Sequence, residues 1–515
     1  MSWHTGTATD YKDLFNKVVQ IVTSNSVATA VVSAGGTGYV VGDVLTASGG
    51  TFLNAAKFRV TTESGGVVTG LVIQEGGSYS SNPSSPVSTT GGTGTGCTVT
   101  VTFSGNGWTA VRQTSQASTA TVAAGGTGYT VGDDITVVGG NFATAAVFNV
   151  DSVSSGAITA VSLVTAGEYR DKPTNPVSVT GGTGTGGTLN VTFIPYTGAN
   201  EREAILQGIG SGSDTIYVGM KSYNVLSQNS IDTTYNWNLI GMTGFNSSLN
   251  FESQAGVSPG GIPVSTGGAY VPLHNNGSFP ITYWVSVTGR RIIGIFKVEN
   301  STITHYTSMY LGWLNPFGTS TEFPYPIYVS GSSARHDVLF SVTSPSMTGL
   351  TEMIGLNART GPGYVRFSDG TWKTVRNSVA VDTGSPTRAV ERAVVVYPCG
   401  QTALTFVATD DLVVNDSLFD FDDMIPPGGV PGTATKRLQK TPNTGGDLAL
   451  LVPATVCLTE SAIVVDVWGE LDDVFWVSGI GMSSGDTVTI GTQRYRVFQN
   501  GNRTTDFSFM AIKEN

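Results

Sequence analysis

Hydrophobic and polar residues alternate over short segments along most of this chain. In the first 103 residues, the segments ATAVVS, YVVGDVLTAS, AKFRVTTE, VVTGLVIQ and CTVTVTF follow this period-two pattern. Such alternation is typical of strands that bury one face. Clusters of Gly, Pro, Asn and Ser separate the segments, and these residue types favour turns. The pattern therefore predicts an all-β fold.

The same pattern returns 90 residues later. The hexapeptide AGGTGY stands at residues 34–39 and again at 124–129. Around it, the first segment aligns with the second without a gap, and about half of the aligned positions are identical. We expect two tandem copies of one small glycine-rich β module, at residues 28–103 and 120–193. The glycines between strands fit turns that need a positive φ.

One segment near the start departs from the strand pattern. In TDYKDLFNKVVQIVT the apolar residues recur at helical spacing, which predicts an amphipathic helix over about residues 10–23. Its apolar stripe must cover either the body of the protein or a neighbouring subunit. The stripe consists of Tyr11, Leu14, Phe15, Val18 and Val22.

Outside the modules, the chain shows many short strands, which favour a multidomain protein with a β-sandwich or jelly-roll-like body. The stretch NEREAILQGIG predicts a short helix that ends at Gly208. Between the modules, Trp108 lies in a segment that either connects them or forms a strand of the body. The expected parts beside the modules are the helix and lead-in (1–27), the connecting segment (104–119), the central body (194–424), a Pro/Gly loop (425–446) and a C-terminal β region (447–515).

Composition and charge limit the classes of function that the chain can have. Only 12% of the 515 residues are charged and the net charge is −11, so no basic face for nucleic acid is expected. The three cysteines do not make a disulfide framework, which fits assembly in a reducing compartment. We find no secretion signal at the start and no apolar run long enough for a membrane span.

The densest aromatic segment is YTSMYLGWLNPFGTSTEFPYPIYVSGSS. Its prolines make it a poor central strand, and we expect a rigid, extended loop. Aromatic loops of this kind lie in a core, anchor subunit interfaces or stack on sugar rings. The candidate interface residues are Trp313, Phe317, Phe323 and Tyr325.

Several motifs suggest chemistry, and each has a simpler structural interpretation. The GGTGTG stretches have no following Lys and helix, so they predict turns and not a phosphate-binding loop. Asp43 and Asp133 follow glycines and fit turn carboxylates, with calcium ligation as the alternative. The acidic stretch 409–424 is a solvated face or a divalent metal site. In GMSSG, Ser483 precedes a strand, whereas a nucleophile elbow requires a helix there.

Other enzyme signatures are weak. The four histidines are scattered without metal-ligand spacing. Acidic pairs such as Glu470 with Asp472 or Asp473 could serve a glycosidase only if they faced a cleft. We therefore expect no enzyme, no catalytic residue, no metal and no cofactor.

Several stretches resemble virion structural proteins of tailed bacteriophages. AGGTGYVVGDVLTASGGTF resembles glycine-rich modules that many phage proteins contain. More specific are TDYKDLFNKVV, DTIYVGMKSYN with YNWNLIGMTGF, YLGWLNPFGTSTEFPYPIYV and the closing YRVFQNGNRTTDFSFMAIKEN. The resemblance covers most of the chain. It implies a component of the tail, baseplate or neck, made and assembled in the bacterial cytoplasm, and it carries over no catalytic residue.

The main hypothesis is a structural protein that binds its own copies and other virion proteins, with the modules as decoration or attachment domains. A symmetric homo-oligomer is expected, and we favour a trimer. The alternative is a tail fibre or spike that binds a glycan of the host surface. A depolymerase that acts on this glycan is the third hypothesis.

Overall fold

The protein is all-β, as predicted, with one α-helix among the described residues. The computed structural model describes residues 2–210, 214–226, 233–260, 268–274, 280–299, 304–319, 321–322, 325–333, 363–366, 370–376, 392–396, 451–460, 463–477, 482–491, 493–499 and 509–514. The acidic stretch 409–424 and the Pro/Gly loop 425–446 lie outside these residues.

The tandem repeat forms two small β modules with the same topology. Each has eight strands, and corresponding strands follow the same order, β4-β7-β2-β9-β8-β3-β5-β6 in module 1 and β13-β16-β11-β18-β17-β12-β14-β15 in module 2. Module 1 consists of β2 (Asn25–Thr37), β3 (Val44–Ala47), β4 (Thr51–Asn54), β5 (Lys57–Ser64), β6 (Val67–Glu75), β7 (Ser78–Ser81), β8 (Val87–Thr90) and β9 (Thr95–Gly105). Module 2 consists of β11 (Ser115–Thr127), β12 (Asp134–Val137), β13 (Asn141–Thr144), β14 (Val147–Ser154), β15 (Ala157–Thr165), β16 (Glu168–Asp171), β17 (Val177–Thr180) and β18 (Thr185–Pro195).

The repeated AGGTGY closes one end of each module. In module 1, β2 ends inside this motif, and Gly36 has φ +61°, where a Cβ would collide with the carbonyl oxygen of Thr95. The ring of Tyr39 then turns into the core, where only 2% of the residue is exposed. Its hydroxyl accepts a hydrogen bond from the backbone N–H of Cys97 at 3.4 Å. The motif is repeated because each module needs the same sharp turn and the same buried tyrosine.

The expected N-terminal helix is α1 (Tyr11–Thr23). Asp10 caps it by accepting hydrogen bonds from the backbone N–H groups of Lys12 and Asp13, at 2.7 and 2.8 Å. The apolar stripe is buried within the same chain, and the Phe15 ring meets the Trp237 ring edge-on at 5.5 Å. The stripe therefore packs on the body and not on another subunit.

Two sheets and α1 enclose one hydrophobic core, which defines the body. The five-stranded sheet has the order β10-β19-β20-β21-β22, and a thirteen-stranded sheet begins with β1-β23-β24-β25. The body strands are β1 (Ser2–Ala8), β10 (Thr109–Gln113), β19 (Glu203–Ile209), β20 (Thr215–Leu226), β21 (Thr233–Met242), β22 (Ala269–His274), β23 (Ile281–Val287), β24 (Arg291–Glu299), β25 (Thr304–Pro316), β26 (Ile327–Ser330), β27 (Gly363–Arg366), β28 (Trp372–Arg376), β29 (Arg392–Val396), β30 (Val452–Glu460), β31 (Ile463–Val477), β32 (Thr487–Ile490), β33 (Gln493–Gln499) and β34 (Phe509–Lys513), with a single 3-10 turn, η1 (Phe251–Ser253).

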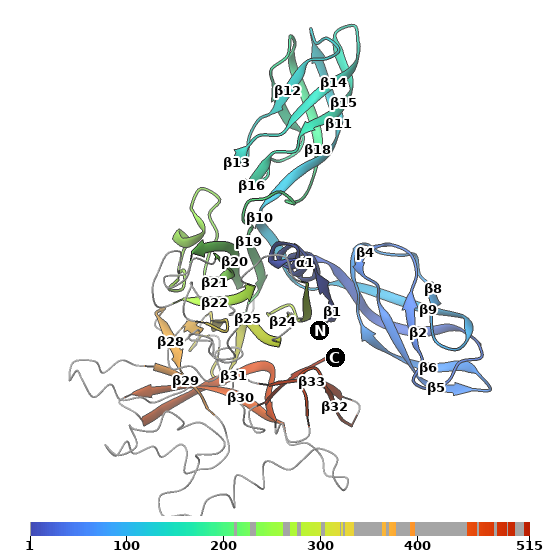
Figure 1. The fold of residues 1–515 in the computed structure, drawn as a ribbon, viewed down its shortest axis with the longest axis vertical. Helices are drawn as coiled ribbons and strands as arrows, with labels where there is room; N and C mark the ends of the chain where they lie inside the picture. Colours follow the sequence, from blue (N-terminus) through green and yellow to red (C-terminus); the bar gives the residue numbers. More distant parts are fainter. Residues whose placement is uncertain are drawn as a thin grey trace, which may run out of the picture.

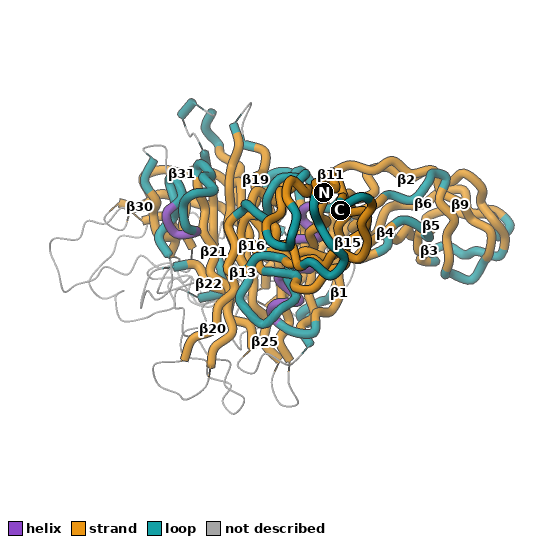
Figure 2. The backbone as a smooth tube through the Cα atoms, turned by 90° about the horizontal axis from the view of Figure 1, so that it is seen from above, coloured by secondary structure: helices purple, strands orange, loops and turns teal. Residues whose placement is uncertain are grey.

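The segment between the modules is part of the body. Strand β10 pairs with β19, and the Trp108 side chain lies in the body core. Module 1 is thus inserted before β10 and module 2 after it. The modules leave the body in different directions, with module 2 at the top and module 1 at the right of the view (Figure 1). From above, module 1 again extends away to one side (Figure 2).

Two local expectations are wrong. The stretch predicted as a helix ending at Gly208 is strand β19, which pairs with β10 on one side and β20 on the other. Its residues 203–206 are all buried, so both faces pack and the local helical pattern is overridden. The aromatic segment is also not a loop throughout, because β25 continues to Pro316 and pairs with β24, β26 and β31.

Candidate functional site: the junction of module 2 and the body

A buried arginine joins module 2 to the body. The Arg112 side chain is 0% exposed, and its Nε and Nη2 donate to the two carboxylate oxygens of Asp171 at 2.8 and 3.1 Å. Its Nη1 donates to Glu203 at 3.1 Å. The backbone carbonyls of Ser247 and Leu249 accept from the same guanidinium at 2.9 and 3.1 Å. Arg112 therefore binds β16 of module 2, β19 and a loop of the body at once.

This arginine is buried among other charged groups. Its guanidinium lies 5.1 Å from the centre of the Phe245 ring. Burial raises the pKa of the Glu203 carboxyl, and the nearby cations Lys221 and Arg112 only partly offset this. A planar guanidinium suits the site because it donates to several acceptors in fixed directions. We call this group the Arg112 clamp.

Further polar contacts surround the Arg112 clamp. Arg170 donates to the Asn250 side chain at 2.9 Å, and the Thr197 backbone N–H donates to Gln116 at 3.0 Å. All these contacts lie at the base of module 2, so the rest of the module projects freely from the body in Figure 1.

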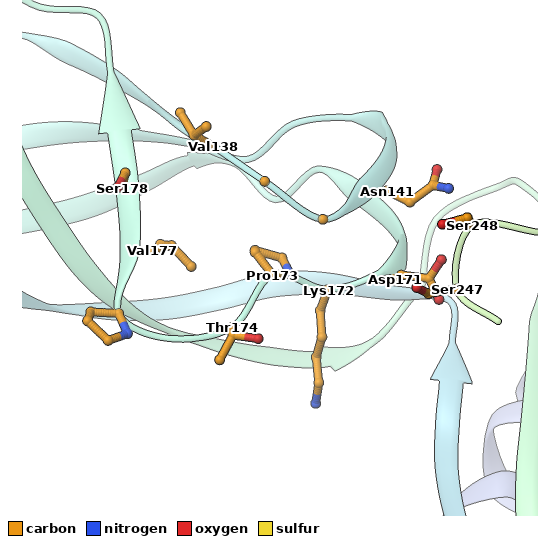
Figure 3. Close-up of a pocket in the computed structure, with 13 residues that line it drawn as sticks. Val138, Asn141, Asp171, Lys172, Pro173, Thr174, Val177, Ser178, Ser247 and Ser248 are labelled. Atoms are coloured by element: carbon orange, nitrogen blue, oxygen red, sulfur yellow. The ribbon is translucent and has the colours of Figure 1, made fainter. Parts of the chain in front are cut away.

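A groove of about 620 Å³ runs along this junction. Figure 3 shows that residues of module 2 form most of its lining, while Ser247 and Ser248 of the body lie at one end, beside Asn141 and Asp171. Hydroxyl, amide and carboxylate groups line it, together with Lys172. In the groove, Asp171 is already bound by the Arg112 clamp, so the arrangement offers hydrogen bonds to a ligand but no acid–base pair.

The repeated aspartates are turn carboxylates. Asp43 Oδ2 accepts from the backbone N–H groups of Val40 and Thr93, both at 3.0 Å. Asp133 makes the same bonds with Thr130 and Thr183, both at 2.9 Å. These backbone donors lower the pKa of both carboxyls, that of Asp133 to about 2. Within the described ranges, no three His, Cys, Asp or Glu side chains could together hold a metal ion.

The three candidate interface residues that the structure describes differ in exposure. Trp313 is 4% exposed on β25 and belongs to the body core, so it is not available to a partner. Phe317 is 58% exposed just beyond this strand. Tyr325 is half-buried against the body core, with Arg366 over its ring at 5.3 Å. Phe323 lies outside the described residues. Of the three that the structure describes, only Phe317 offers a large exposed apolar side chain.

The enzyme candidates have structural roles where the structure describes them. Ser483 lies in a turn before β32, where its backbone N–H donates to Asp486 at 2.7 Å. The Arg291 side chain, 0% exposed, pairs with both Asp472 and Asp473. Asp472 and Asp473, the two possible partners of Glu470, therefore share one buried cation.

Of the four histidines, His4 is completely buried, and this burial lowers its pKa to about 3. The described residues contain no helix that is long and apolar enough to cross a membrane.

Sequence patterns alone did not indicate the Arg112 clamp. Its one signal was an isolated arginine in the connecting segment of a chain with few charges. Comparisons with known proteins add no assignment, since no family model and no curated protein matches this chain.

Proposed function

We propose that this chain is a self-assembling structural component of a tailed bacteriophage particle, in its tail, baseplate or neck. The body would bind its own copies and other virion proteins, and the modules would project as decoration or attachment domains. The resemblance of several segments to phage virion proteins supports the proposal that the chain is part of a phage particle. The two modules, anchored differently on one body, support a structural role.

One observation carries the self-assembly part of the proposal. In module 1, Ile73 and Gln74 on β6 line cavities that body residues line from the other side, and Glu75 accepts a hydrogen bond from Thr5 at 3.3 Å. The corresponding residues of β15 in module 2 are Leu163 and Val164, which are 37% and 56% exposed. This part of the strand is thus half-buried beside the body in module 1, whereas it is apolar and exposed in module 2. Apolar surface of this kind is common at protein interfaces.

A second copy of the chain is the partner that we propose for this face. Gln74 and Glu75 of module 1 are replaced by Val164 and Thr165 in module 2, so no charge there opposes contact between identical surfaces. Closed symmetry is the usual outcome when such surfaces meet.

Light scattering of the purified full chain tests this. We expect the molar mass of an oligomer, with a trimer favoured. In the Leu163→Ser, Val164→Ser double variant, the mass should fall toward that of a single chain. Val131→Ser is the matched control, because Val131 is 62% exposed elsewhere on module 2 and its loss should leave the mass unchanged. A mass of one chain at all concentrations would contradict self-assembly.

A further inference from the structure

A second cavity lies between module 1 and the C-terminal strands. It has a volume of about 250 Å³, and we call it the seam pocket. Residues of β5 and β6 form one side, and residues of β33 and the end of the chain form the other. The lining residues are Arg59, Val72, Ile73, Gln74, Gln493, Arg494 and Glu514.

Positive charge exceeds negative charge at the seam pocket. Its one carboxylate, Glu514, has a side chain that is 3% exposed and lies between Arg494 and Arg496, at 2.9 and 2.6 Å. These two arginines already satisfy Glu514. Arg59 adds a third guanidinium, and its buried Nε has no hydrogen-bond partner in the described structure. This excess stands out in a chain with a net charge of −11.

Comparison of the two modules shows that Arg59 lacks the hydrogen-bond acceptors that its counterpart in module 2 has. In module 2 the matching position is Asn149, whose amide donates to Asp134 at 2.9 Å and to the Gly132 carbonyl at 3.1 Å. In module 1 the strand neighbours of Arg59 are Val44 and Val72, whose side chains cannot accept a hydrogen bond.

The Asn149 amide of module 2 therefore finds its hydrogen-bond acceptors within the module. In module 1 the matching residue is the cation Arg59, which lies between two valines. Module 1 is also the copy that borders the seam pocket. A buried guanidinium nitrogen without an acceptor is costly, and a bound anion would supply the acceptor.

We propose that the seam pocket binds a small carboxylate-bearing ligand, no larger than one sugar ring. Arg59 and Arg494 donate to the carboxylate, since guanidinium groups match its planar geometry. Gln493 bonds a polar group of the ligand, while Val72 and Ile73 pack against its carbon skeleton. The volume is below the range of about 300–1,000 Å³ that is usual for drug-sized ligands, which limits the ligand to this size.

Such a ligand would contact module 1 and the C-terminal strands together. Binding would then stabilise the seam between them, because a ligand that binds only the closed arrangement favours it. This site is independent of self-assembly and of the Arg112 clamp.

Calorimetric titration of the full chain with glucuronate, and with glucose as the neutral control, tests the proposal. We expect glucuronate to bind at one site per chain and glucose not to bind. Arg59→Asn introduces the residue that module 2 has at the matching position, and it should weaken glucuronate binding at least about tenfold. Arg59→Lys should weaken binding less, since it keeps the charge but loses the planar fork. The matched control is Lys172→Gln, which removes one positive charge from module 2 and should leave binding unchanged.

Three results would overturn the proposal. They are equal binding of glucose and glucuronate, unchanged glucuronate affinity in Arg59→Asn, and binding of sulfate without any binding of glucuronate. The last would mean a site for inorganic ions instead of a carboxylate ligand. Arg59 is half-buried on β5, and its buried Nε makes no hydrogen bond that a variant would break, so loss of folding in its variants is not expected.

Discussion

Arg112 of the body holds Asp171 of module 2 through two parallel hydrogen bonds, of 2.8 and 3.1 Å. The two residues are 59 positions apart, and most of module 2 lies between them in sequence. The same guanidinium binds Glu203, where the chain returns to the body. One side chain therefore fixes both ends of the inserted module against the sheet that it leaves.

Replacing this arginine should free module 2 and destabilise the junction. In Arg112→Met, the buried Glu203 and the partly buried Asp171 lose their cation. Removal of one partner from a buried ion pair costs about 3–5 kcal/mol. We expect the free energy of unfolding from urea titration to fall by this order, and small-angle scattering to show a wider range of module orientations.

Arg170→Gln is the control for the Arg112→Met variant. Arg170 lies at the same junction but is partly exposed, with one hydrogen bond to Asn250 and a longer ion pair of 3.5 Å with Asp171. Its loss should change stability by less than about 1 kcal/mol. If Arg112→Met and Arg170→Gln had equal small effects, the Arg112 clamp would not be what positions module 2.

Much of the fold could be predicted from the sequence because its local signals agree with its packing. The helix at residues 10–23 has a capping aspartate and a stripe at helical spacing, and both appear in α1. The 90-residue repeat fixed the equivalence of the two modules, and their sheets share one strand order. Asp43 and Asp133 showed their turn role through a glycine before each.

The failures have a common physical cause, which is contact between residues far apart in sequence. Residues 203–206 have a helical composition but lie between β10 and β20, where ladder hydrogen bonds and burial on both faces decide the structure. The aromatic segment left core and interface open for Trp313, and only the pairing of β25 places this side chain in the core. Similarly, the Arg112 clamp joins segments that no local pattern relates.

The buried tyrosines of the two modules should behave as a matched pair. Tyr79 and Tyr169 are 0% exposed, and their hydroxyls accept from the backbone N–H groups of Ala56 and Ala146, both at 2.8 Å. Tyr→Phe at either site leaves a buried N–H without a partner, which costs about 1–3 kcal/mol. Hydrogen exchange should therefore be faster at Ala56 in Tyr79→Phe and at Ala146 in Tyr169→Phe, by similar factors. An effect at only one site would show that the modules are not equivalent in stability.

Acid should weaken the turn that Asp133 holds. Hydrogen bonds from Thr130 and Thr183 depress the pKa of its carboxyl to about 2, below the value of about 3.9 in an unfolded chain. The stabilisation is thus present above about pH 4 and is lost as the pH falls through about 2. In Asp133→Asn, module 2 should lose this pH dependence when its unfolding is followed between pH 5 and pH 2. Asp151→Asn is the control, since Asp151 accepts one hydroxyl and no backbone N–H.

Gly208 tests the strand that the sequence predicted as a helix. At the end of a helix, Gly208→Ala would be a mild change. On β19, a Cβ at this position would lie 2.5–2.7 Å from carbon atoms of the Trp108 ring. The indole cannot easily move, because it is buried and its Nε1 donates to the Thr288 carbonyl at 2.7 Å. We expect Gly208→Ala to lower the free energy of unfolding by about 1–3 kcal/mol through overpacking.

The control for Gly208→Ala is Gly244→Ala, where the nearest atom to a Cβ is 3.4 Å away. Both changes can be followed by urea titration with tryptophan fluorescence, and only Gly208→Ala should also shift the native emission. Equal stability of the two variants would mean that the Trp108 ring has room to move. The contact that joins β10 to β19 would then be looser than the buried indole indicates.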